Sequence, residues 1–534
     1  MRAFAELLDR LSYTPGRNDK LRLMAAYFRE TGDPDRGWAL AALTGTMPFS
    51  FPLRRVLGEV LADKVDAQLY RMSRDYVGDT AETVALLWPE AVGDEDAGGV
   101  ADNPLRLGDV VDVLLVLPPH KLVETLSGWL DRLDPAGRWA LLKLLTGGLR
   151  VGVSARLAKT AIGQSWGRPV DDIEELWHGL TPPFTELFDW LEGRAARPDL
   201  SGLPVFRPMM LAHPLDESEL AGWDLADYAI EWKWDGVRVQ IASRGGDTRL
   251  YTRTGDEVGA AFPEIAGTDF GDVVVDGELL VVRDGNVAPF NDLQQRLNRK
   301  SVTKKQMAAF PAHVRLYDML EHEGEDLRAF GLGERRARLE SWYALAPRPM
   351  VDISEVLSIA GLAELQALWE GTREDGIEGL MVKRLGSPYL AGRPKGHWFK
   401  WKRAPLMADC VVMYAQRGSG RRSSLYSDYT FGAWREQDDG TRELVPVGKA
   451  YSGFTDEELF ALDAWVRAHG RESYGPVRAV EPELVFEVAF DAIQKSSRHK
   501  SGIAMRFPRI HRVRWDKPAD EAERICTLKK LVDS

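Results

Sequence analysis

EWKWDGVR, residues 231–238, is the stretch from which the organisation of this chain can be worked out. The segments on either side of its Asp-Gly dipeptide, AIEWK and VRVQIA, have the composition of β-strands, and the dipeptide predicts a hairpin turn between them. Because side chains alternate along a strand, Glu231 and Lys233 are expected on one face. Arg238 is then expected on the returning strand, near the lysine.

Lys233 is a candidate nucleophile. An ammonium group reacts poorly near neutral pH, so a reactive lysine needs burial or a neighbouring positive charge to lower its pKa. Arg238 is a candidate for that charge and for a phosphate contact. The alternative interpretation is a surface hairpin in which both side chains are only solvated. This segment by itself does not separate the two interpretations.

Four further segments follow in order, and each supplies a group needed to transfer a nucleotide to a lysine. LYTRTGDEV carries Arg253 before a Thr-Gly turn, and VVVDGELLVV, a second predicted Asp-Gly hairpin, carries Glu278 as a candidate Mg²⁺ ligand. EGLMVK places Glu378 at the start of an apolar strand. WFKWK places Lys400 and Lys402 on one strand face, where they can bind phosphates.

Each supporting residue also has an ordinary structural interpretation. Tyr317, in the segment LYDML, is typical of a core tyrosine. Glu378 is compatible with the end of a surface turn, and Lys402 with a solvated strand edge. Their joint order along the chain favours the functional interpretation.

The order KWDGVR, RTG, DGE, YDML, EGLMVK, WFKWK and RFPR resembles that of the covalent nucleotidyltransferase superfamily, and most closely the ATP-dependent DNA ligases. LLTGGLRVGVSARLAKTAIG (residues 144–163) is similar to the helical DNA-binding domain of the larger enzymes of this family. GIAMRFPRIHRVRWDKPADEA (residues 502–522) is similar to their final motif. The resemblance covers nearly the whole chain.

The resemblance implies a role for each residue of the nucleotide site. Lys233 would become adenylylated, Glu231 would contact the edge of the adenine, and Tyr317 would stack on the adenine ring. Arg238 and Arg253 would hold phosphate and ribose.

Further residues would bind the metal and the phosphates. The resemblance implies that Glu278 and Glu378 serve the metal and the ribose, and that Lys400 and Lys402 bind the α-phosphate. Arg393 would be a further nucleotide contact, although it precedes Lys400 by seven positions, one more than the family pattern. In the final motif, Arg506, with Arg509 and Lys517, would reach the triphosphate and act mainly in the first reaction step.

The chain is expected to have several domains, because its 534 residues exceed what one core usually contains. Leu and Ala recur at helical spacing in residues 1–203, which predicts an all-α domain, implied by the resemblance to bind DNA. Strands with Asp-Gly turns mix with helices in residues 204–404, as in an α+β nucleotidyltransferase (adenylation) domain. Short strands with one helix in residues 405–534 predict a C-terminal β-barrel of the OB-fold class.

Charge and composition fit this organisation. The net charge is −12, yet residues 495–517 contain eight Lys or Arg against one acid, and residues 400–422 contain six against one. Such runs suit a phosphate backbone, whereas acid gathers elsewhere, as in residues 93–99. Two cysteines, with no CxxC pair, indicate neither a disulfide framework nor a zinc module. No apolar run predicts a signal sequence or membrane span, so a cytoplasmic location is expected.

The predicted function is an ATP-dependent DNA ligase that seals 5′-phosphate/3′-hydroxyl nicks through a lysyl-AMP intermediate and AMP-capped DNA. It would use ATP and Mg²⁺, with Mn²⁺ as an alternative metal, and would act as a monomer on nicked double-stranded DNA. Three alternatives stay open. They are an end-joining or RNA-tolerant polynucleotide ligase, an mRNA-capping-type guanylyltransferase, and a DNA clamp without catalysis.

Overall fold

The computed structural model describes residues 1–49, 51, 53–62, 64–77, 79–89, 105–297, 299–371, 376–418, 425–437, 439–475, 477–496 and 499–532. The acidic segment 93–99 and the basic residues Arg421, Arg422 and Arg498 lie outside the described residues. Contacts divide the chain into two compact units. One contains Met1–Val170, Thr181–Ala195 and Pro405–Ser534, and the other contains Asp171–Leu180 and Ala196–Ala404. The domain limits at residues 203 and 404 stay predictions.

The first unit begins with helices that bury their apolar faces, as predicted for this region. Helix α9 shows how the sequence sets its limits: the Asp134 side chain caps its first turn and Pro135 occupies its first position. Gly147, with φ of 66°, ends it in the left-handed conformation that favours glycine. The helices are α1 (Arg2–Tyr13), α2 (Arg17–Glu30), α3 (Asp35–Thr44), α4 (Leu53–Leu61), α5 (Ala67–Val77), α6 (Thr80–Leu87), α7 (Leu107–Val116), α8 (Leu122–Arg132), α9 (Pro135–Thr146), α10 (Ala155–Ser165) and α12 (Thr185–Leu191).

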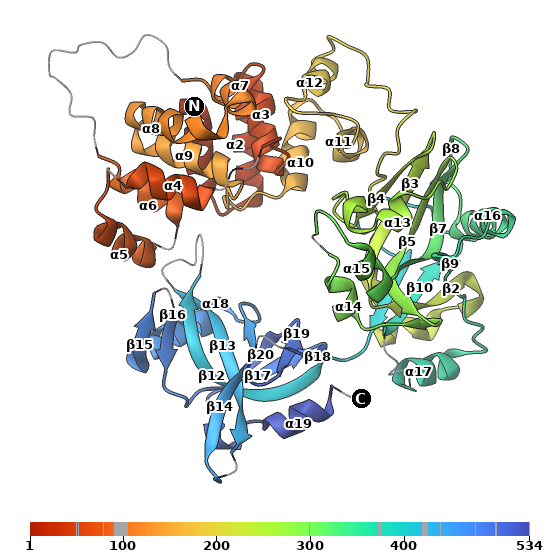
Figure 1. Cartoon of the computed structure of the whole chain (residues 1–534). Helices are drawn as coiled ribbons and strands as arrows, with labels where there is room; N and C mark the ends of the chain where they lie inside the picture. The colour runs from red at the N-terminus through yellow and green to blue at the C-terminus, as the bar shows by residue number, and fades with distance from the viewer. Residues whose placement is uncertain are drawn as a thin grey trace. The chain divides into compact units, whose positions relative to one another are not determined.

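The second unit contains two β-sheets (Figure 1). The smaller sheet has the strand order β1-β11-β10-β2. The larger has the order β4-β3-β5-β7-β8, with β6 beside β5 and β9 beside β7. The strands are β1 (His213–Pro214), β2 (Tyr228–Trp234), β3 (Val237–Arg244), β4 (Asp247–Thr252), β5 (Val273–Arg283), β6 (Asn286–Val287), β7 (Ala312–His322), β8 (Glu325–Asp326), β9 (Val351–Ile353), β10 (Ile377–Arg384) and β11 (Trp398–Lys402).

Helices and apolar clusters fix these two sheets. One cluster joins the sheets and includes Trp398 from the smaller and Val274 and Tyr317 from the larger. A second packs the larger sheet against α16, and a third packs the smaller sheet against α17. The predicted α+β class is therefore confirmed. The helices of this unit are α11 (Val170–Trp177), α13 (Pro263–Ala266), α14 (Phe290–Gln294), α15 (Lys304–Ala309), α16 (Leu332–Leu345) and α17 (Leu362–Gly371).

A short segment of the predicted helical domain packs with these sheets. Glu175 of α11 accepts hydrogen bonds from Arg328 (2.7 Å) and Arg197 (3.2 Å). The ring of His178 lies 4.6 Å from that of Tyr251. These contacts explain why residues 171–180 group with the second unit.

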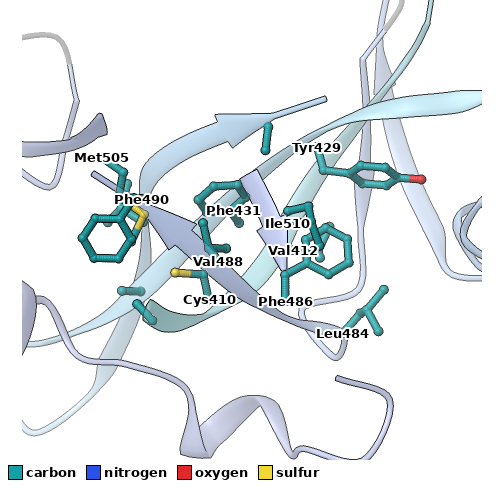
Figure 2. Close-up of a cluster of buried hydrophobic side chains, with 14 of the residues drawn as sticks. Cys410, Val412, Tyr429, Phe431, Leu484, Phe486, Val488, Phe490, Met505 and Ile510 are labelled. Atoms are coloured by element: carbon teal, nitrogen blue, oxygen red, sulfur yellow. The ribbon is translucent and has the colours of Figure 1, made fainter. Parts of the chain in front are cut away.

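The C-terminal region is β-rich, with a long strand β12 that pairs with three others. Its first half pairs with β17 and its second half with β16, so the sheet curls, as predicted for an OB-type barrel. Figure 2 shows Val412, Phe431, Phe486 and Val488 converging in the core. The elements are β12 (Leu406–Arg417), β13 (Tyr426–Glu436), β14 (Arg442–Ala450), α18 (Asp456–Ala468), β15 (Gly470–Tyr474), β16 (Val477–Val480), β17 (Val485–Phe490), β18 (Ala492–Lys495), β19 (Ile503–Arg506), β20 (Arg509–Arg514) and α19 (Ile525–Lys530).

In the part of the chain that the structure describes, no helix is both long enough and apolar enough to cross a bilayer.

Candidate active site

Asp235 and Gly236 connect strands that belong to different sheets. β2, which carries Lys233, pairs with β10, whereas β3, which carries Arg238, pairs with β4 and β5. The predicted hairpin is therefore wrong: an Asp-Gly dipeptide allows a sharp change of direction, but burial against other strands decides the pairing. Gly236 is also required by space, since a Cβ there would lie 2.5 Å from the Leu279 carbonyl oxygen.

The smaller sheet arranges the predicted lysines in two adjacent rows across β2, β10 and β11. Residues two apart on a strand share a face, so both rows project to the same side of the sheet. The first row is Lys233, Gly379 and Lys402, and the second is Glu231, Met381 and Lys400.

Glu378 is turned toward the first row by an irregularity in β10. Gly379 has φ of 144°, and the pairing of β10 with β2 shifts register between Ile377 and Gly379. A bulge of this kind re-aims a side chain. The Glu378 carboxylate accepts a hydrogen bond from Lys233 Nζ (2.5 Å) and lies 3.2 Å from Lys402 Nζ.

The charge of Glu378 follows from these contacts. Burial by itself would raise the pKa of this carboxyl, but Lys233 and Lys402 outweigh burial and lower the pKa to about 2. Glu378 is therefore an anion at neutral pH, placed between two lysines.

β5 is one continuous strand and not the predicted hairpin. Asp276 and Gly277 lie in its middle, between β3 and β7. A Cβ on Gly277 would lie 2.8 Å from the carbonyl oxygen of Arg315 on β7. The glycine therefore permits a close approach of two strands rather than a turn.

Glu278 lies opposite Arg238 across β5 and β3. Burial raises the pKa of Glu278 to about 8, with nearby Glu378 and Asp276 adding to the effect and Lys233 and Arg238 opposing it. A cation bound beside this carboxyl would favour its ionised form. Its role as a metal ligand stays a prediction.

The side chain of Asp276 is fully buried and accepts four hydrogen bonds. Arg238 donates to both of its oxygens, from Nε (3.1 Å) and Nη2 (2.5 Å). Tyr317 Oη donates to Oδ1 (3.2 Å) and Tyr389 Oη to Oδ2 (2.7 Å). An ionised carboxylate has about four acceptor positions, so Asp276 is saturated. Arg238 also donates from Nη1 to the Met210 carbonyl oxygen (2.5 Å).

Sequence reasoning missed Asp276 and Tyr389. The available signal for Asp276 was one acidic residue within an apolar strand, because a buried carboxylate needs hydrogen-bond partners. No local pattern marks Tyr389, which lies 113 positions away in the chain.

A second group of contacts lies two residues along β2 from Lys233. Glu231 is only 2% exposed, and its carboxylate oxygens lie 3.0 Å from Lys383 Nζ and 3.4 Å from Arg336 Nη1. Lys383 Nζ also lies 3.9 Å from the centre of the Tyr317 ring. Glu231 and Tyr317, both predicted to contact a base, are therefore linked through Lys383. Arg336 is a further contact that the sequence patterns do not identify.

Cations gather around Lys400. Burial lowers the pKa of Lys400, and the charges of Arg393, Lys402, Lys233 and Arg253 lower it further. The side chains of Arg393 and Arg253 are exposed. This grouping fits an anionic ligand with several charges, and it includes Arg393 despite its unusual spacing.

The predicted residues of the final motif belong to the first unit. Arg506 ends β19, and its guanidinium carbon lies 5.1 Å from the centre of the Phe507 ring. Arg509 begins β20, and Lys517 Nζ lies 2.6 Å from Asp409. Their contact with a triphosphate stays a prediction.

Comparison with known proteins identifies the family. The protein-family model described as "ATP dependent DNA ligase domain" matches residues 209–402, and the family model described as "ATP dependent DNA ligase C terminal region" matches residues 422–517. "DNA ligase 1" of Korarchaeum cryptofilum is 30% identical over 549 residues, with 100% of this chain and 98% of the relative covered. A "Probable DNA ligase" of Koribacter versatilis is 29% identical over 570 residues, with 100% and 97% covered.

The fold is shared as well. The solved structure "Pmar-Lig_Pre." aligns with 96% of this chain and 99% of its own, with a TM-score of 0.57 and 17% identity. At that identity the likeness shows the fold alone. Sequence relatives and both family models agree, so the chain belongs to the ATP-dependent DNA ligases.

Proposed function

We propose that this enzyme seals nicks between a 5′-phosphate and a 3′-hydroxyl in duplex DNA, through an AMP group carried by Lys233. The observation that carries the proposal is the set of contacts around this lysine. Its Nζ is held 2.5 Å from Glu378, and Lys402 lies across the sheet in the same row.

In the first step, Lys233 Nζ attacks the α-phosphorus of ATP after losing its ammonium proton. A P–N bond forms, the P–O bond to the β-phosphate breaks, and pyrophosphate leaves. Lys400 and Lys402 would bind the α-phosphate and offset the charge that develops on it. Arg393 and Arg253, exposed near Lys400, would contact the remaining nucleotide.

The adenine would lie at the Glu231 end of the site. Tyr317 would stack on the base, and the Glu231 carboxylate would accept a hydrogen bond from the exocyclic amine, which favours adenine over guanine. Lys383 and Arg336 hold that carboxylate in place.

Mg²⁺ fits the carboxylates at the other end. Among the described residues, no group of three His, Cys, Asp or Glu side chains is close enough to hold a metal by itself. Mg²⁺ at phosphoryl-transfer sites is usually bound by one or two carboxylates together with substrate phosphates and water. Glu278 and Glu378 can provide the carboxylates. Bound there, the metal would offset charge on the phosphates.

The DNA steps would follow at the same site. The 5′-phosphate of the nick attacks the phosphorus of the lysyl-AMP, the P–N bond breaks, and AMP caps the DNA end. The 3′-hydroxyl then attacks the 5′-phosphate, forms the phosphodiester bond and releases AMP.

The test is labelling followed by a chase. The protein and Lys233→Ala are incubated with Mg²⁺ and α-labelled ATP, GTP or NAD⁺, and nicked duplex DNA is then added. Label retained from ATP by the unaltered protein only, and released as the nick is sealed, is the expected result. Labelling from GTP or NAD⁺ instead of ATP, or retained label that nicked DNA does not release, would contradict the proposal.

A further inference from the structure

Tyr389 is a buried residue outside every sequence motif that defines the site. Its hydroxyl donates to Asp276 Oδ2 (2.7 Å) and accepts from Arg238 Nη2 (3.1 Å), and its ring packs edge-on against Trp398. Only 3% of its surface is exposed. Burial raises the pKa of the hydroxyl, which therefore stays protonated and donates its proton to Asp276.

The segment that follows Tyr389 carries Arg393. Gly392, next to the arginine, forms two backbone hydrogen bonds with residues 209–211: its N–H donates to the Met209 carbonyl oxygen (3.1 Å), and its own carbonyl oxygen accepts from Leu211 N (2.6 Å). The Arg393 carbonyl oxygen lies 3.1 Å from His213 Nε2. The backbone on both sides of the arginine is therefore fixed.

Segment 209–214 also contacts the rest of the site. The Met210 carbonyl oxygen accepts from Arg238 Nη1 (2.5 Å), and Pro214 pairs with Lys400 on β11. Arg238 is thus linked to the segment 389–393 in two ways. One link is direct, to the Tyr389 hydroxyl, and the other runs through Met210, whose neighbours Met209 and Leu211 bond to Gly392. These contacts close a ring that joins both arginines to the buried Asp276.

We propose that Tyr389 is a positioning residue, whose hydroxyl fixes the place of Arg393 relative to Arg238 and the lysine rows and thereby sets the affinity of the site for ATP. The inference rests on the proposed function, because it takes the site around Lys233 to bind ATP. Tyr389 acts through Asp276 and Arg393 rather than by touching the reacting atoms.

Tyr389→Phe tests this, since it removes the hydroxyl and keeps the ring. Tyr343→Phe is the matched control, because Tyr343 Oη donates to the backbone carbonyl oxygen of Val351 (2.8 Å) in the same unit, outside the predicted nucleotide contacts. Two quantities are measured on the full chain. They are the ATP dependence of single-turnover Lys233 labelling with Mg²⁺, and the Kd of ATP by calorimetry in EDTA.

Loss of a hydrogen bond to a charged group weakens an interaction measurably, but here the loss would act on ATP indirectly, through Arg393. We therefore expect the half-saturating ATP concentration and the Kd to rise about three- to tenfold. Tyr343→Phe should leave both unchanged. In an Arg393→Gln background, Tyr389→Phe should have a clearly smaller effect, because one of the two arginines that the hydroxyl connects is already gone.

Other results would overturn the inference. An unchanged Kd in Tyr389→Phe with a lowered melting temperature would make the hydroxyl structural only. Equal effects of Tyr389→Phe with and without Arg393 would show that the hydroxyl does not act through Arg393. The Kd from calorimetry makes this comparison possible even where labelling is too slow to follow. Absence of labelling in the unaltered protein would instead count against the proposed function.

Discussion

Lys233 Nζ and Glu378 Oε2 lie 2.5 Å apart, although the two residues are 145 positions apart in the chain. The contact depends on a single irregularity in β10, where Gly379 bends the strand and turns Glu378 onto the face of the lysines. The candidate nucleophile is therefore held by a carboxylate that two lysines keep ionised.

Glu378→Gln tests whether the negative charge of Glu378 is needed for the reaction of Lys233. The amide keeps the size of the side chain but loses the charge between Lys233 and Lys402, so we expect lysine labelling to fall about 100-fold or more. Initial rates of labelling with α-labelled ATP measure the effect. Glu334→Gln, at an exposed pair with Arg338, is the control and should label normally. A Glu378→Gln variant that labels as fast as the control would refute this role.

Gly379→Ala should destabilise the smaller sheet. A Cβ at this position would lie 2.2 Å from the Trp401 carbonyl oxygen, and φ of 144° is unfavourable for any L-residue with a side chain. We expect a loss of about 1–3 kcal/mol in unfolding free energy, measured by denaturant titration, and a loss of labelling. Gly386→Ala is the control, because a Cβ there meets no atom within 4 Å. Equal stability of the two variants would contradict the argument.

Glu278 should make stability depend on pH. Its pKa is raised from 4.5 to about 8 in the folded chain, so the folded state binds the extra proton between these values. The stabilisation of the folded state by this group is therefore fully present below about pH 4.5 and is lost as the pH rises toward about 8.

Glu278→Gln removes this dependence. In EDTA, the melting temperature of Glu278→Gln minus that of the unaltered protein should increase from pH 5 to pH 8.5, because only the unaltered protein loses this stabilisation. A difference that stays constant across this range would show that the carboxyl is not protonated in the folded chain.

Arg506→Ala should affect the first reaction step more than the last. If this arginine reaches the triphosphate, lysine labelling should fall about tenfold, while sealing of a nick that already carries AMP should change little. Both rates are measured with the same preparation. Arg471→Ala is the control, since Arg471 pairs with Glu481 on the surface of the same C-terminal region. An equal loss in both steps would argue against contact with the triphosphate.

The sequence predicts much of the site because strand alternation is local. Glu231 and Lys233, and Lys400 and Lys402, share a face for that reason alone. The two Asp-Gly dipeptides predict hairpins that the fold does not contain, because the turn signal is local, whereas strand pairing is decided by burial against distant strands. Gly277 is needed for its lack of a side chain, not for a turn.

The buried polar contacts could not be predicted in the same way. The bonds from Tyr389 and Tyr317 to Asp276 join three strands or segments far apart in the sequence, and no periodicity connects them. Such networks become visible only when the positions of all partners are known.

The most direct test of the central claim is to locate the AMP group. The protein is incubated with ATP and Mg²⁺, digested, and its peptides are analysed by mass spectrometry. We predict one AMP per chain on the peptide that contains Lys233, and none after Lys233→Arg, which retains the positive charge. AMP on another residue, or undiminished AMP in Lys233→Arg, would contradict it.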